Sequence, residues 1–160
     1  MKKSWNKLII LMLFIIYIYC VIKIILFKFS SVDIAVLWRQ LHIVLENPDI
    51  VMKRMHAGNL TPFSSIKHNI HRLLSIRDFS NLIGNILIFI PNGIFISILT
   101  RYKLISSFIL SFAFSLGLEC SQAIFSIGVF DVDDIILNVS GGIAGYVAYQ
   151  MIRWTVLLFK

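Results

Sequence analysis

Four long apolar runs limit this chain to the folds that a lipid bilayer allows. They cover residues 8–27, 82–99, 104–125 and 135–158. A helix needs about 20 apolar residues to cross a bilayer, and each run is close to that length. Because 58% of the residues are hydrophobic and only 14% are charged, the composition also excludes an ordinary soluble domain. We therefore expect an all-α membrane protein with four transmembrane helices in a single domain, 1–160.

The short segments beside these runs predict the orientation of the chain. The positive-inside rule places short basic segments in the cytoplasm. The segment 126–134 contains aspartates and no lysine or arginine, so it should lie outside. We expect both termini in the cytoplasm, in a cell-membrane protein with a long extracytoplasmic loop over 28–80. The basic residues that share the cytoplasmic side are Lys2, Lys3, Lys7, Arg101, Lys103, Arg153 and Lys160.

The long loop is predicted to contain helices that lie along the membrane surface. Apolar residues recur at helical spacing from Ile34 to Leu45, which is typical of an interfacial amphipathic helix. A helix that packs on the protein itself would show the same pattern. The sequence 47–49, Asn-Pro-Asp, should end this helix, and a second amphipathic piece covers 66–77. The loop carries basic residues suited to anionic headgroups or pyrophosphate: Lys28, Arg39, Lys53, Arg54, Lys67, Arg72 and Arg77.

Polar residues follow one face of each of the last three runs. A charge at mid-bilayer costs about 2.5–3.5 kcal/mol on insertion scales, so these groups should turn away from lipid and meet. In the expected topology five of them lie at similar depth in the outer leaflet and form a polar pocket open to the outside: Asn85, Glu119, Gln122, Asp134 and Asn138. Gly141 and Gly145 would let a neighbouring helix approach closely. The polar faces comprise Asn81, Asn85 and Asn92; Ser107, Ser111, Ser115, Glu119, Gln122 and Ser126; and Asp134 and Asn138.

Each of these residue types also has a structural interpretation. Asp131, Asp133 and Asp134 precede a helix, where carboxylates cap the first turn and complement its dipole. The asparagines are equally suited to hydrogen bonds between helices, and the serines to close packing. Glu119 favours a functional role, because an ionisable group inside a membrane is a candidate site by default.

The remaining motifs indicate no cofactor, metal or nucleic-acid site. His68 and His71 are three residues apart, but no acid or cysteine joins them at the spacing of a zinc site. We find no serine–histidine or cysteine–histidine pair and no glycine loop that would cradle a phosphate. The net charge of +7 comes largely from basic residues that flank apolar runs, so we do not expect nucleic-acid binding.

Four segments together resemble the VanZ-like family of membrane proteins. They are NLTPF at 59–63, NLIGNILIFIPNG at 81–93, ECSQAIF at 119–125 and GVFDVDDIILNVSGGIAGY at 128–146. Asn92 departs from the family, which usually has an apolar residue after the proline. The resemblance implies a multi-pass membrane protein and, for the member that gives the family its name, teicoplanin resistance.

Two functions are compatible with this pattern. In the first, a non-catalytic protein binds a lipid-linked cell-wall precursor or the lipidated drug at the outer membrane surface. Teicoplanin bears an acyl chain and vancomycin does not, so a mechanism at the membrane would explain selective resistance. The candidate binding residues are Asn59, Pro62, Phe63, Asn81, Asn85, Glu119, Gln122, Asp133, Asp134 and Asn138.

The second function is a membrane-embedded enzyme that modifies a lipid-linked envelope precursor. Glu119 would act as general acid or base, and Asp134 and Asn138 would orient the headgroup. Alternatively, Asp134 and Glu119 would hold a magnesium or calcium ion, which prefer oxygen ligands. A third interpretation is a small partner subunit that packs another helix against Gly141 and Gly145.

Overall fold

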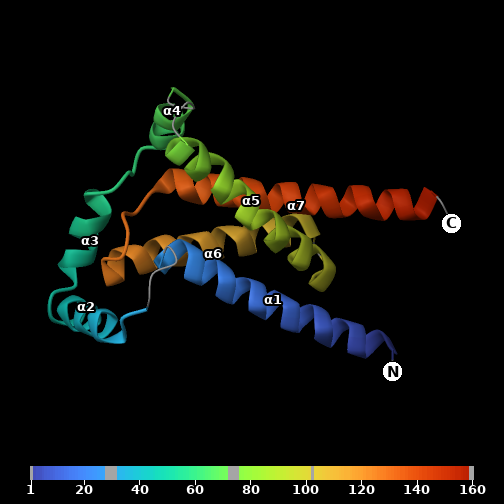
Figure 1. The fold of residues 1–160 in the computed structure, drawn as a ribbon, viewed down its shortest axis with the longest axis horizontal. Coiled ribbons are helices and arrows are strands. Elements are labelled where there is room, and N and C mark those ends of the chain that lie inside the picture. Colours follow the sequence, from blue (N-terminus) through green and yellow to red (C-terminus); the bar gives the residue numbers. More distant parts are fainter. Residues whose placement is uncertain (1, 28–31, 72–75, 102, 159–160) are drawn as a thin grey trace.

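The structure, a computed structural model, describes the chain except residues 1, 28–31, 72–75, 102 and 159–160, and the side chains of 2–6, 71 and 76–80. Within the described residues the chain forms seven helices and no β-strand (Figure 1). The four long helices are α1 (Lys2–Phe27), α5 (Ile76–Leu99), α6 (Lys103–Phe125) and α7 (Val132–Leu158). The three short ones are α2 (Ile34–Glu46), α3 (Asp49–His56) and α4 (Ser64–His71).

The four long helices are long and apolar enough to cross a membrane, which confirms the predicted all-α multi-pass fold. Their spans are Lys7–Phe27, Asn81–Leu99, Lys103–Phe125 and Val132–Leu158. The last helix begins at Val132, before the predicted start at Ile135. The reason is the capping bond from the Asp133 backbone nitrogen to Oδ1 of Asp131, at 2.8 Å.

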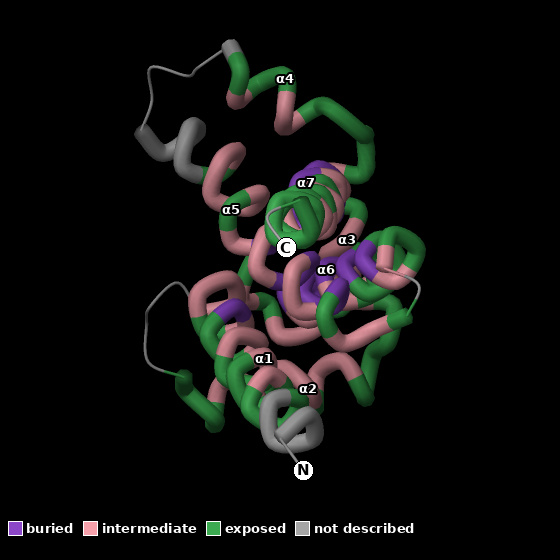
Figure 2. Tube along the Cα trace, turned by 90° about the vertical axis from the view of Figure 1, so that its right-hand side faces the viewer, coloured by how far each residue is buried: buried purple, intermediate pink, exposed green. Residues whose placement is uncertain are grey.

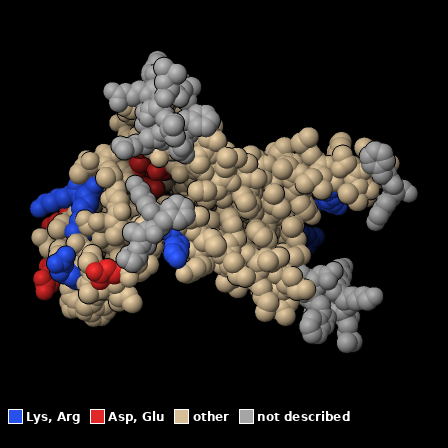
Figure 3. Space-filling view, in the orientation of Figure 1, with Lys and Arg blue, Asp and Glu red and all other residues tan. Residues whose placement is uncertain are grey.

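The short helices and the chain ends occupy opposite ends of the molecule. In Figure 1, α1 begins and α7 ends on one side, whereas α2, α3 and α4 lie on the other. Figure 3 shows basic and acidic side chains gathered at the end that holds α2 and α3, and an uncharged surface along the middle of the same face. The start of α1 and the end of α7 therefore lie on the same side of the apolar middle. That this side is the cytoplasm remains a prediction.

Glycines bring the backbones of α5 and α7 into contact at the centre of the bundle. A Cβ atom added at Gly145 would lie 2.0 Å from the Ile90 carbonyl oxygen, and one at Gly93 would lie 1.9 Å from the Gly142 carbonyl oxygen. Figure 2 shows buried residues on α6 and α7 where the helices meet. The predicted close approach at Gly145 is confirmed, and it involves a helix of the same chain. These glycines are therefore not free to pack a helix of another subunit.

The first helix joins the bundle beside the proline of α5. The Tyr17 hydroxyl donates a hydrogen bond of 2.7 Å to the carbonyl oxygen of Ile88, close to Pro91. Val21 is buried against Phe89 and Leu118. These contacts fix the end of α1 that lies nearest the short helices.

Helix α2 has one face on the protein and another that is exposed. It contacts α6, yet the side chains of Ile34, Trp38 and Leu45 are 76%, 63% and 68% exposed. The helix therefore packs on the protein with one face, and the location of its exposed face at the membrane surface stays a prediction. The helix ends at Glu46, directly before the Asn-Pro-Asp sequence that was predicted to end it. Helix α3 begins at Asp49 and was not predicted.

The second amphipathic piece lies only partly within the described residues. Helix α4 (Ser64–His71) covers the first part of the predicted range 66–77. The residues 72–75 lie outside the described part of the chain, and Ile76 and Arg77 already belong to α5.

Arg54 of α3 fastens the short helices to the end of α6. Its Nη1 donates to the carbonyl oxygens of Ala123 and Ile124, at 3.0 and 2.8 Å, and its Nη2 donates to Oε1 of Gln40 at 2.7 Å. The last carbonyls of a helix have no partner within the helix, and a cation there also complements the helix dipole. Arg54 is thus a helix-capping residue.

Replacing Arg54 with leucine should destabilise this end of the molecule by about 1.5–3 kcal/mol, because hydrogen bonds to a charged group are lost and carbonyls of α6 stay unpaired. The measurement is the unfolding midpoint of purified protein in detergent. Arg39→Leu is the matched control, because Arg39 is exposed on α2. Equal midpoints for the two variants would contradict the capping role.

Candidate functional site

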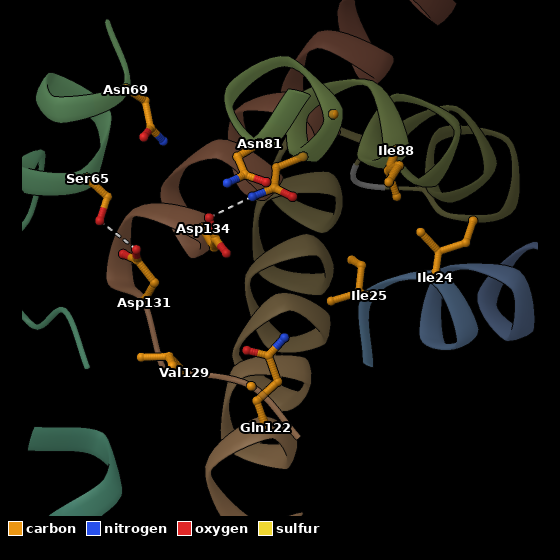
Figure 4. Close-up of a pocket in the computed structure, with 13 residues that line it drawn as sticks. Ile24, Ile25, Ser65, Asn69, Asn81, Ile88, Gln122, Val129, Asp131 and Asp134 are labelled. Atoms are coloured by element: carbon orange, nitrogen blue, oxygen red, sulfur yellow. Dashed lines mark hydrogen bonds between the residues drawn. The ribbon is translucent and has the colours of Figure 1, made fainter. Parts of the chain in front are cut away.

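A cavity of about 620 Å³ lies at the end of the bundle that carries the short helices. It has two unlike walls (Figure 4). The apolar wall comes from α1 and α5 and consists of Ile24, Ile25 and Ile88, whereas Val129 lies beside Asp131 on the other side. The polar wall comes from α4, α5, α6 and the start of α7, and consists of Ser65, Asn69, Asn81, Asn85, Gln122, Asp131 and Asp134.

The polar wall is held together by a bond between two membrane helices. The Asn85 amide on α5 donates to Oδ1 of Asp134 on α7, at 2.6 Å. Asp134 lies in the first turn of α7, where a carboxylate is favoured by the helix dipole. Gly84, next to Asn85, also lines the cavity, and a Cβ added there would meet no atom within 4 Å. The cavity is therefore open in front of this pair.

Glu119 lies behind the cavity. Its side chain is 1% exposed, so it faces the interior of the bundle, as the sequence predicted. One carboxylate oxygen, Oε2, accepts a 2.8 Å hydrogen bond from the Asp131 backbone nitrogen. Asp131 and Asp134 are both within electrostatic range of Glu119. Glu119 thus fixes the backbone that enters α7, immediately beside the polar wall.

The segment around Asn59 pairs with the same stretch of backbone. The Asn59 backbone nitrogen donates to the Phe130 carbonyl oxygen at 2.9 Å, and the Val132 nitrogen donates to the Asn59 carbonyl oxygen at 3.0 Å. The Asn59 amide also donates to Oδ1 of Asp131 at 2.8 Å. A Cβ added at Gly58 would lie 2.1 Å from the Phe130 oxygen, so this pairing requires glycine. The long loop is therefore bound to the start of α7.

Asp133 anchors the start of α4. Its side chain is fully buried and accepts hydrogen bonds from the backbone nitrogens of Phe63 and Ile66, at 2.5 and 3.0 Å, and a longer one from the Asn59 amide. It thereby occupies the place of an N-cap for α4, although it comes from α7. Phe63 has a φ of 66°, which is uncommon for a residue other than glycine. The Asp133 contact holds it there.

Asn138 and the serines of α6 form the buried floor behind the site. The Asn138 amide nitrogen donates to Oγ of Ser115 at 2.8 Å, while its buried Oδ1 has no hydrogen-bond partner in the described part of the chain. Asn92 donates to Oγ of Ser111 at 2.9 Å, so it bonds to α6. The predicted inward face holds for Ser107, Ser111 and Ser115, which are fully buried. It fails for Ser126, which is exposed beyond the end of α6.

Comparison with known proteins supports the family resemblance of the four sequence segments. The family model described as VanZ/LLP1 matches residues 14–153. The chain belongs to the VanZ/LLP1 family. Protein VanZ of Enterococcus faecium is 36% identical over 97 residues, which are 58% of this chain and 52% of that protein. The matched region thus spans about half the length of this relative. No solved structure matches the chain.

The residues singled out from this VanZ/LLP1 sequence fall into separate places. Asn81, Asn85, Gln122 and Asp134 line the cavity. Glu119 and Asn138 are buried behind it. Asn59, Phe63 and Asp133 form the junction between the long loop and α7, and Pro62 is exposed in the adjoining turn. Their roles in binding remain a prediction.

Several cavity residues were not predicted. Ser65 and Asn69 are four positions apart on α4, so their shared face could have been found from the sequence. Ile24 and Ile25 could not be recognised as cavity residues from the sequence, because α1 contains many apolar residues. Among the described residues, no group of three or more His, Cys, Asp and Glu side chains is placed to hold a metal ion.

Proposed function

We propose that this VanZ/LLP1 protein contributes to teicoplanin-type resistance by binding a membrane amphiphile in the cavity beside Asn85. The observation that carries the proposal is the pair of unlike walls, one of isoleucines and one of amides and carboxylates. A ligand with an apolar chain and a polar head matches both walls at once. A lipid-linked cell-wall precursor and the lipidated drug are both of this kind.

The position of the cavity supports capture at the membrane surface. The ends of α1 and α6 and the starts of α5 and α7 surround it, so it lies at one limit of the apolar spans. A ligand held there keeps its chain beside α1, where Ile24 and Ile25 face the cavity, while its head meets Asn85 and Asp134 (Figure 4). Binding either the precursor or the drug at this depth would reduce drug capture.

The basic residues of the long loop contribute less to headgroup binding than the composition of the loop indicated. Arg54 is engaged with α6 and is not available for a headgroup. Arg39, Lys53 and Lys67 are exposed and can attract an anionic membrane surface. We assign to these three residues an accessory role outside the cavity.

The enzyme alternative has less support. Glu119 is not among the residues that line the cavity, and its Oε2 is engaged by the Asp131 backbone. A general acid or base must come within hydrogen-bond reach of the reacting group. We therefore propose a binding function and place Glu119 among the residues that position the polar wall.

Filling the cavity should abolish protection. Gly84→Leu places a side chain in open space that the ligand would occupy, so the fold should persist while binding is lost. In a susceptible Gram-positive host that expresses the wild-type chain, the minimum inhibitory concentration of teicoplanin should rise. With Gly84→Leu it should return to that of the empty vector at equal protein level in the membrane.

Gly117→Leu is the matched control, because a Cβ at Gly117 also meets no atom within 4 Å and Gly117 is exposed on α6, away from the cavity lining. This variant should protect as well as the wild type. Vancomycin, which has no acyl chain, serves as the comparison drug. Equal protection against teicoplanin and vancomycin, or full protection by Gly84→Leu, would contradict the proposal.

A further inference from the structure

The Gln122 side chain has no hydrogen-bond partner among the described residues and lines the cavity. The residue is 6% exposed. Figure 4 shows the amide reaching from α6 into the cavity. Its amide atoms are open to the cavity, where water or a ligand can pair with them. A ligand with matching donors and acceptors would take the place of that water.

The protein backbone makes room for this amide. A Cβ added at Gly128 would lie 2.7 Å from Cδ and 2.8 Å from Oε1 of Gln122. Any other residue at Gly128 would press on the amide group. The glycine in the turn after α6 therefore sets where the Gln122 amide can lie.

Two further amides face the same space. Asn81 on α5 and Asn69 on α4 line the cavity, and neither side chain makes a hydrogen bond to a described residue. Each amide offers two donor hydrogens and an acceptor oxygen. With Gln122, the polar wall presents both kinds of group from three separate elements.

We infer that the cavity recognises the sugar head group of a glycosylated amphiphile, an inference that rests on the proposed function. Sugar hydroxyls donate and accept, so they match free amides better than a head that only accepts. The charge of the Asp131 carboxylate beside the amides repels a phosphate. Among the described residues of the lining, none is lysine, arginine or histidine. The isoleucines of α1 would cover the start of the apolar chain.

The sugar has two sources that share this chemistry. One is the glycosyl group of a lipid-linked wall precursor, and the other is a sugar on a lipidated glycopeptide. In both, the hydroxyls would meet Gln122 and Asn81, and any phosphate would stay outside the cavity.

The test compares amphiphiles that differ only in the head group. The full chain is placed in lipid nanodiscs, and the binding of dodecyl maltoside and of dodecyl phosphate is measured by calorimetry, with empty nanodiscs subtracted. We expect dodecyl maltoside to bind at least about tenfold more tightly than dodecyl phosphate. Gln122→Leu should weaken dodecyl maltoside by about tenfold, which is the effect of losing one or two hydrogen bonds, and leave the weak binding of dodecyl phosphate unchanged.

The unfolding midpoint separates recognition from structure. Because the Gln122 side chain bonds to no described residue, Gln122→Leu should not lower the midpoint. Gln150→Leu is the matched control, since Gln150 lies on α7 outside the lining of this cavity, and it should not change binding. The assay is then repeated with a lipid-linked disaccharide precursor and with teicoplanin. The compound whose binding Gln122→Leu weakens identifies the source of the sugar.

The outcomes distinguish this inference from the proposed function. If dodecyl phosphate binds as tightly as dodecyl maltoside, or if Gln122→Leu leaves dodecyl maltoside unchanged, the sugar inference is overturned. Loss of all binding in Gly84→Leu would in that case leave the cavity proposal standing. If the wild type binds dodecyl maltoside and Gly84→Leu binds it equally well, both the sugar inference and the proposed function are overturned.

Discussion

Asp133→Ala should release the long loop from the end of the bundle. The substitution removes a fully buried carboxylate that accepts hydrogen bonds from the backbone nitrogens of Phe63 and Ile66. Each hydrogen bond to a charged group is worth about 1.5–3 kcal/mol, and the donors would stay unpaired, so we expect a loss of about 3 kcal/mol or more. For a chain of this size, that corresponds to a fall in Tm of about 6–12 °C.

Limited proteolysis would locate the effect. Lys67 lies on α4 and is exposed, so trypsin should cut the variant after Lys67 faster than the wild type once α4 loses its cap. Asp49→Ala is the matched control, because Asp49 is an exposed aspartate in the first turn of α3. If the Asp133→Ala and Asp49→Ala variants had the same Tm and trypsin cut both at the same rate, Asp133 would not anchor α4.

The membrane helices could be predicted because the bilayer leaves few alternatives. A backbone in hydrocarbon must satisfy its own hydrogen bonds, so an apolar run of sufficient length becomes a helix whatever its neighbours are. The lipid environment also allowed us to predict which face of α6 is turned inward. Ser107, Ser111, Ser115 and Glu119 recur every four residues, and all are buried because polar groups avoid lipid.

The capping role of Asp131 was predicted from the sequence, but the roles of Asp133 and Asp134 could not be predicted in this way. Asp131, Asp133 and Asp134 are near neighbours in sequence, yet one caps α7, one caps α4 and one bonds to Asn85. The partners of Asp133 lie about seventy positions earlier, as the separations of its bonds to Phe63 and Ile66 show. Periodicity reports which face of a helix is polar. It does not report which distant segment meets that face, and for the same reason the placement of α1 beside the cavity was not foreseen.

Gly145→Leu should have the largest effect of any single substitution considered, because it places a side chain where a backbone already lies. The added Cβ would be 2.0 Å from the Ile90 carbonyl oxygen and 3.1 Å from Cα of Gly93, and neither can move aside like the end of a flexible side chain. Helices in a bilayer gain little from the hydrophobic effect, so their association depends on such close packing. We expect Gly145→Leu to fail to accumulate in the membrane and Gly145→Ala to lose about 1–3 kcal/mol.

The chain supplies its own comparison for this effect. Gly117 on α6 is also a glycine within a membrane-spanning helix, but a Cβ there meets no atom within 4 Å. Gly117→Ala should therefore leave the Tm unchanged or raise it slightly, because alanine favours the helix by up to about 1 kcal/mol. The measurement is the amount of folded protein recovered from membranes, together with its Tm in detergent. Normal accumulation of Gly145→Leu would show that α5 and α7 do not touch at this point, and the close contact that brings Asn85 to Asp134 would then need another cause.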